Sequence, residues 1–253
     1  MFPFLQVADP IEQFEIKKVL PIDVAGYDLA ITNSALYMIL GVVLVIALFG
    51  YSATRTSLVP SRIQSIGELG YEFVANMVRS TTGEEGLKFF PFVFTLFTFI
   101  LVANLIGMIP YAFTTTSHLA VTGAMALLVI AIVIVYGFIK NGLGFFRLFL
   151  PSGVPILIAP LLVVIEVISF LARPITLGMR LFANMLAGHI MLKLLAAFAV
   201  SLAGAGAFAA LAPAPFILAI AITALEFLVS FIQAYVFALL TCVYLNDALH
   251  PGH

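Results

Sequence analysis

The stretch RPITLGMRLFANMLAGH, residues 173–189, places two arginines, an asparagine and a histidine within a long apolar segment. A guanidinium stays protonated at any physiological pH, and a charge in hydrocarbon is costly. The stretch therefore raises the question of what compensates these charges.

Composition places the chain in a bilayer. Of its 253 residues, 63% are hydrophobic and 9% are charged, whereas soluble domains are about 25% charged. Mean hydropathy is +1.20. The net charge of −1 provides no basic field for nucleic acid. The single cysteine, Cys242, excludes an intrachain disulfide framework.

Charge-free runs mark the membrane crossings. Residues 29–54, 89–117 and 119–139 contain no charged side chain, and each run exceeds the ~20 residues that a spanning helix needs. Two longer apolar runs, about 153–203 and 215–246, follow and are separated by small residues and prolines. We therefore predict a single all-α integral membrane domain, 1–253. Its predicted elements are a span 30–54, an interfacial helix 61–80, spans 89–112 and 118–140, and a long, tilted C-terminal hairpin 153–203 and 213–248.

The 153–203 segment is too long for one perpendicular crossing. A helix of that length must be tilted, bent or broken. Pro155, Pro160 and Pro174 provide places to bend it.

The segment 61–80 has the pattern of an amphipathic helix. Its apolar face comprises Ile63, Ile66, Leu69, Phe73, Val74 and Met77. Its polar face comprises Ser65, Glu68, Glu72, Asn76 and Arg79. Such a helix lies on a membrane surface or packs on other subunits, and the two arrangements are compatible.

Lysines and arginines predict the orientation. They occur in loops 55–88 and 140–147 but not in loops 111–118 and 204–214. The positive-inside rule then places the two basic loops and the C-terminus on the cytoplasmic or matrix side, and the N-terminus outside. The N-terminus lacks the pattern of a cleavable signal peptide.

Motifs of soluble enzymes are absent from the sequence. It has no Gly-rich phosphate loop, no HExxH and no GxSxG, and its four histidines lack the spacing of a zinc site. We therefore expect no enzyme active site in the chain alone, no cofactor and no metal.

Helical geometry sorts the polar residues of the last two apolar runs. Glu166, Arg173 and Arg180 are seven residues apart and form one stripe, which Asn184 extends. His189 follows Arg180 by nine residues, so it points to the opposite face about 13 Å along the axis.

The hairpin predicts which residues of its two helices lie level. If the turn centres near residue 207, His189 lies level with Glu226, Arg180 with Gln233, and Glu166 with Asp247. A titratable pair then lies near the outside, and a cluster of Glu166, Arg173 and Asp247 lies near the inside. Arg180 has no acid at its own level.

Five of these residues have either a structural or a functional interpretation. Arg180 either reaches an interface or Glu166, or pairs with a charge on another subunit. His189 and Glu226 are either a buried hydrogen-bonded pair or a proton relay. Asn184 and Gln233 either join helices or line the relay.

The motif RPITLGMRLFANMLAGHIM, together with ALEFLVSFIQAYVFALLTCVYLNDA, NLIGMIPY and DPIEQFEI, resembles subunit a of the F-type ATP synthases. The resemblance covers nearly the whole chain. It implies a proton-translocating stator subunit with two offset aqueous half-channels beside a rotating c-ring. Arg180 would separate the half-channels and face the ring carboxylate.

The resemblance also implies site residues and partners. Asn184, His189, Glu226 and Gln233 would line the outer half-channel, and the inner one would be lined by Glu166, Ser169, Arg173 and Asp247. The implied partners are the c-ring, peripheral-stalk subunit b, the other ATP synthase subunits and membrane lipid. We expect a bacterial inner membrane, with a mitochondrial inner membrane as the alternative.

A self-contained secondary transporter or channel is the rival hypothesis. Such folds often contain inverted repeats, and the sequence shows none. A purely structural anchor does not explain six ionisable residues in the two long apolar runs, which are Glu166, Arg173, Arg180, His189, Lys193 and Glu226.

Overall fold

The computed structural model describes residues 14–20, 23–24, 27–28, 30–54, 61–109, 112–150 and 158–250. Pro155, one of the prolines expected to bend the long hairpin, lies outside these residues. So does the predicted start of the hairpin at residue 153.

Within these described residues, five helices are long and apolar enough to cross a membrane, which confirms the predicted all-α membrane fold. They are α1 (Asn33–Thr54), α3 (Phe90–Gly107), α4 (Leu119–Asn141), α5 (Ala159–Ala203) and α6 (Pro213–Leu249). A sixth helix, α2 (Arg62–Thr82), is amphipathic in sequence. A short 3-10 helix, η2 (Glu84–Phe89), precedes α3, and another, η4 (Gly142–Leu148), follows α4.

Helix α5 is continuous over 45 residues and contains Pro174. At 1.5 Å per residue its contour is about 67 Å, more than twice the ~30 Å of a hydrocarbon core. Of the three arrangements expected for this segment, a break is therefore excluded between residues 159 and 203.

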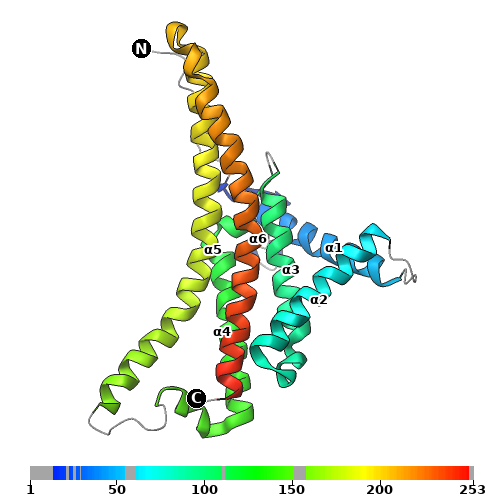
Figure 1. Ribbon diagram of the computed structural model, residues 1–253, viewed down its shortest axis with the longest axis vertical. Coiled ribbons are helices and arrows are strands. Elements are labelled where there is room, and N and C mark those ends of the chain that lie inside the picture. The colour runs from blue at the N-terminus through cyan, green and yellow to red at the C-terminus, as the bar shows by residue number, and fades with distance from the viewer. Residues whose placement is uncertain are drawn as a thin grey trace. The chain divides into compact units, whose positions relative to one another are not determined.

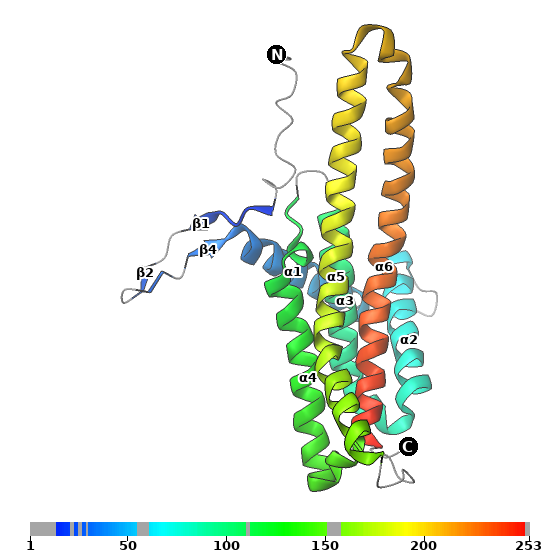
Figure 2. The same ribbon diagram turned by 90° about the vertical axis from the view of Figure 1, so that its left-hand side faces the viewer.

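The chain divides into two compact units. The first comprises Met1–Leu44, Ile100–His118 and Leu181–Gln233, and the second comprises Val45–Phe99, Leu119–Arg180 and Ala234–His253. In the first unit the end of α5 and the start of α6 lie side by side and antiparallel, joined through η5 (Gly206–Leu211). Figures 1 and 2 show them as the yellow and orange helices.

Four short strands near the N-terminus were not predicted. β1 (Lys18–Leu20) pairs antiparallel with β4 (Ile31–Thr32), and β2 (Asp23–Val24) with β3 (Tyr27–Asp28), as Figure 2 shows. Asn33 connects the start of β1 to α1. Its Oδ1 accepts hydrogen bonds from the backbone N–H of Lys17 at 3.2 Å and of Ser34 at 2.9 Å. The side chain therefore fixes the point at which strand becomes helix.

In the second unit, Ser61 caps α2 by accepting the backbone N–H of Gln64 at 3.3 Å. The predicted apolar face of α2 is divided. Val74 and Met77 are buried, and the ring of Phe73 lies 5.7 Å from that of Phe97 and 5.6 Å from that of Tyr235. The remaining members of the face are exposed, Phe73 included; the others are Ile63, Ile66 and Leu69.

Helices α4 and α5 approach closely at Gly178 in the second unit. A Cβ at this position would lie 3.1 Å from the carbonyl oxygen of Thr122 and 3.3 Å from the Cα of Gly123. Both neighbours are backbone atoms, which cannot rotate away. A small residue is what permits this approach between membrane helices.

We therefore predict that Gly178→Ala destabilises the chain by about 1–2 kcal/mol, because the added methyl group overpacks the α4–α5 contact. The measurement is the thermal unfolding midpoint of the detergent-solubilised complex. Gly123→Ala is the matched control, since a Cβ at Gly123 meets nothing within 4 Å. Equal midpoints for the two variants would contradict the prediction.

Candidate functional site

His189 on α5 and Glu226 on α6 face each other in the first unit. The distance from His189 Nε2 to Glu226 Oε1 is 3.6 Å, and the two side chains are 12% and 4% exposed. They lie level, as counting outward from the hairpin turn predicts. Neither oxygen of Glu226 makes a hydrogen bond within the described ranges. The buried carboxyl therefore has no hydrogen-bond donor among these residues.

Thr114 adds a second neighbour to the same imidazole nitrogen. Its Oγ1 lies 3.1 Å from His189 Nε2, closer than the carboxyl oxygen of Glu226. The ring of Phe14 meets the imidazole edge-on at 6.2 Å between centroids. His189 therefore stands between a hydroxyl and a carboxyl, which is an arrangement suited to passing a proton.

A buried polar network in the same unit was not identified from the sequence. Asn104, near the end of α3, donates through Nδ2 to the carbonyl of Ser230 at 3.2 Å, and accepts the hydroxyl of Thr116 at 2.8 Å. All three residues are fully buried. The available signal was an asparagine inside a charge-free span together with the hydroxyl run TTTS, residues 114–117, which folds into η3 (Thr115–Ser117).

The absence of a side chain at Gly188 leaves space for the Glu226 carboxyl group. A Cβ at Gly188 would lie 2.7 Å from Glu226 Oε1 and 3.0 Å from its Cδ. The carboxyl group therefore rests directly against the backbone of α5, one residue before His189. The sequence motif Ala-Gly-His thus has a steric reason for its glycine.

The second unit contains the inner cluster. Arg173 Nη1 donates to Asp247 Oδ2 at 2.8 Å, and its Nη2 lies 3.8 Å from Glu166 Oε1. The guanidinium also lies 5.0 Å from the centre of the Tyr244 ring and 5.6 Å from that of Phe170. The structure therefore joins the three charged residues that the hairpin geometry predicted to be close.

Arg180 lies in the second unit and is exposed. Its guanidinium makes no ion pair or hydrogen bond with any residue that the structure describes. This exposed cation, two residues after the tightly packed Gly178, remains available to a group outside the chain.

Three other candidate residues have no side-chain hydrogen bonds in the described part of the chain. Gln233 is buried and Asn184 half-buried in the first unit, so both carry unused polar atoms. Ser169 is exposed in the second unit and does not join the ion pairs of Arg173. Within the ranges searched, no group of three or more His, Cys, Asp or Glu residues is placed to hold a metal ion.

Comparison with known proteins gives the family. A family model described as ATP synthase A chain matches residues 35–246. The ATP synthase subunit a of Hyphomonas neptunium is 65% identical over 243 residues, covering 96% of each chain. Those of Maricaulis maris and Mesorhizobium japonicum are 60% and 59% identical, and each comparison covers 97% of this chain and 98% of the relative.

The chain belongs to the ATP synthase A chain family.

This membership confirms the resemblance read from the sequence. The chain is a multi-pass membrane protein and the proton-channel stator subunit of an F-type ATP synthase. It is a non-catalytic subunit of a larger complex and therefore has other ATP synthase subunits as partners. The roles of the individual site residues remain predictions.

We predict that Gly188→Ala lowers ATP-driven proton pumping by about tenfold, equivalent to ~1.4 kcal/mol, because the new methyl group pushes the Glu226 carboxyl away from α5. The measurement is acidification of inverted membrane vesicles, normalised to the amount of assembled complex. Gly204→Ala is the control, since its Cβ would have no neighbour closer than 3.8 Å. Full pumping by Gly188→Ala would show that the position of the carboxyl is not critical.

Proposed function

We propose that Arg180 is the electrostatic gate between two aqueous half-channels and that it faces a carboxylate of the rotating c-ring. The observation that carries this proposal is the exposed guanidinium of Arg180, which has no acidic partner in the described chain. An arginine within a membrane segment requires a counter-charge. A carboxylate carried by each ring subunit would supply it.

The outer half-channel is assigned to the first unit. His189 and Glu226 exchange the proton, and Thr114 hydrogen-bonds the imidazole. Asn184 and Gln233 contribute polar atoms along the route. The supporting observation is a buried carboxyl that has no hydrogen bond to any described residue and lies 3.6 Å from a histidine.

The inner half-channel is assigned to the cluster of Glu166, Arg173 and Asp247. Ser169 lies exposed on α5, the helix that carries Glu166 and Arg173. The side chains of Glu166 and Asp247 are 31% and 29% exposed, so water can reach both carboxylates. They accept the proton that the ring releases. Arg173 contacts both carboxylates and holds them in place.

Turnover then follows from electrostatics. A proton that enters through Glu226 and His189 neutralises a ring carboxylate, and a neutral carboxyl enters lipid at far lower cost than a charged one. After rotation the carboxyl loses its proton to the inner half-channel and is attracted to Arg180. Because a guanidinium does not deprotonate, Arg180 cannot pass a proton between the channels. The membrane potential contributes ~2.3 kcal/mol per charge per 100 mV.

The proposed partners are the c-ring and the peripheral-stalk subunit b, with lipid around the apolar helices. We place the chain in a bacterial inner membrane, with its N-terminus periplasmic and its C-terminus cytoplasmic. The relatives compared above come from bacteria, and the basic loops support the orientation. A mitochondrial inner membrane is the alternative.

We predict that Arg180→Ala abolishes ATP-driven acidification of inverted vesicles and raises their passive proton leak, because nothing then separates the two half-channels. Both quantities are measured on the same vesicles, with assembly checked by co-purification of the ring. Arg147→Ala, which removes an exposed arginine from η4, is the control and should pump normally. Undiminished pumping by assembled Arg180→Ala would refute the gate.

We predict that Arg173 and Asp247 act as one unit. Asp247→Asn and Arg173→Gln should each reduce pumping, and the double variant should lose less than the sum of the two. The expected coupling energy is about 1 kcal/mol, because the 2.8 Å pair is only partly exposed. Pumping rates of the four proteins give this energy through a double-mutant cycle. Strictly additive losses would mean that the pair does not work together.

A further inference from the structure

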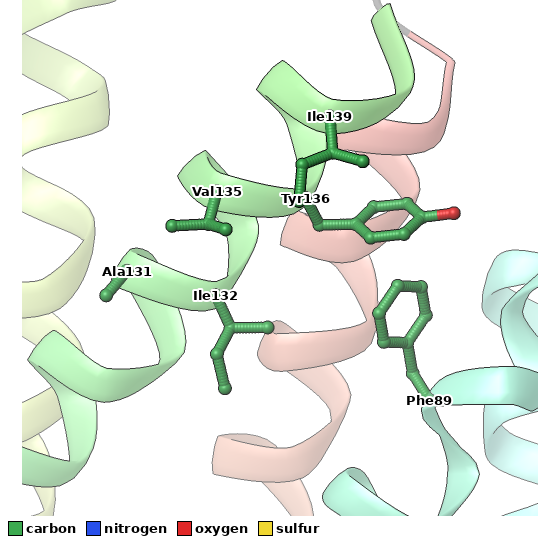
Figure 3. A pocket seen from close by; sticks show the side chains of 6 residues that line it. All are labelled: Phe89, Ala131, Ile132, Val135, Tyr136 and Ile139. Atoms are coloured by element: carbon green, nitrogen blue, oxygen red, sulfur yellow. The ribbon is translucent and has the colours of Figure 1, made fainter.

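An apolar groove lies in the second unit beside the start of α3. Its volume is about 290 Å³, and it is lined by Phe89, Ala131, Ile132, Val135, Tyr136 and Ile139. Figure 3 shows five of these side chains along α4 and Phe89 across from them. Apart from the Tyr136 hydroxyl, every side-chain atom of the lining is carbon.

The groove has the dimensions of one acyl chain in one leaflet. Ala131 and Ile139 are eight residues apart on α4, so the groove extends for about 12 Å. Half of a hydrocarbon core is about 15 Å. A partner membrane helix would use the whole of α4, which is about 34 Å long at 23 residues, whereas the groove is lined only by residues between 131 and 139 of that helix.

A cation lies beside two aromatic rings of the groove lining. Lys88 donates through Nζ to the Tyr136 hydroxyl, and this ammonium lies 4.7 Å from the centre of the Tyr136 ring and 5.6 Å from that of Phe89. Both rings belong to the groove lining. An ammonium has three donors, so two remain for a ligand.

The neighbouring acids are already paired. Glu84 lies 2.9 Å from Arg79, and Glu85 lies 2.7 Å from Lys140. Three cations thus accompany two carboxylates at this edge, and Lys88 is the one that makes no ion pair with the residues described. The surplus charge is positive and lies near the Lys140 end of the apolar helix α4.

We infer that this groove binds an anionic phospholipid, with one acyl chain along α4 and the headgroup phosphate on Lys88. The site is separate from the residues assigned to proton transfer, and it lies in the leaflet on the Lys140 side of the membrane. An ammonium flanked by two aromatic rings, next to an apolar groove, fits an anionic phosphate that carries a hydrocarbon tail. It does not fit a fully polar ligand.

The test uses the whole ATP synthase reconstituted into phosphatidylcholine vesicles that contain a small fraction of a photoactivatable lipid. Two probes carry the same diazirine acyl chain, one with a phosphatidylglycerol headgroup and one with phosphatidylcholine. After illumination, mass spectrometry maps the adducts on Phe89 and on residues 131–139. We expect the anionic probe to label the groove about fivefold more than the zwitterionic one.

Three variants make the test specific. Lys88→Gln should reduce labelling by the anionic probe to the level of the zwitterionic probe and leave the latter unchanged, which also shows that the groove is intact. Lys88→Arg should keep the preference. Arg147→Gln, at an exposed cation that does not line the groove, should have no effect.

Two results would overturn the inference. Equal labelling by both probes, insensitive to Lys88→Gln, would mean that the groove binds bulk lipid without selecting for the headgroup. No labelling of the groove by either probe, while other exposed apolar residues are labelled, would mean that a helix of a partner subunit covers it.

Discussion

The cost of placing charge in hydrocarbon organises the two C-terminal helices. Each ionisable side chain discussed there is accommodated in one of three ways. Arg173 is paired within the chain with Asp247 at 2.8 Å, Glu226 is buried beside a histidine at 3.6 Å, and Arg180 remains exposed. In the proposed function, the first way keeps a charge in place, the second provides a group that exchanges a proton, and the third leaves a cation for a carboxylate of another subunit.

Much of this arrangement could be predicted from the sequence because antiparallel helices advance by the same 1.5 Å per residue. Counting outward from the turn placed His189 level with Glu226 and Glu166 level with Asp247, and the structure brings both sets together. Three charge-free runs and two longer apolar runs likewise predict five apolar helices. These features depend on periodicity and chain connectivity, which a single sequence contains.

The parts that were missed depend on packing between segments far apart in the sequence. Thr114 reaches His189 across 75 positions, and Asn104 reaches Ser230 across 126; no spacing rule connects such residues. The divided face of α2 has the same origin, since Val74 and Ile63 have similar sequence signals, but Val74 is fully buried and Ile63 is 43% exposed. The N-terminal strands are two or three residues long, too short to give a periodic pattern.

The two neighbours of His189 have one further consequence. Thr114 and Glu226 both approach the same nitrogen, Nε2, and that nitrogen carries at most one proton. It can therefore serve the hydroxyl or the carboxyl, but not both at once. In the proposed proton path, His189 therefore passes one proton at a time and accepts the next only after it has released the last. Such single-file delivery suits a rotor that presents its carboxyl groups one after another.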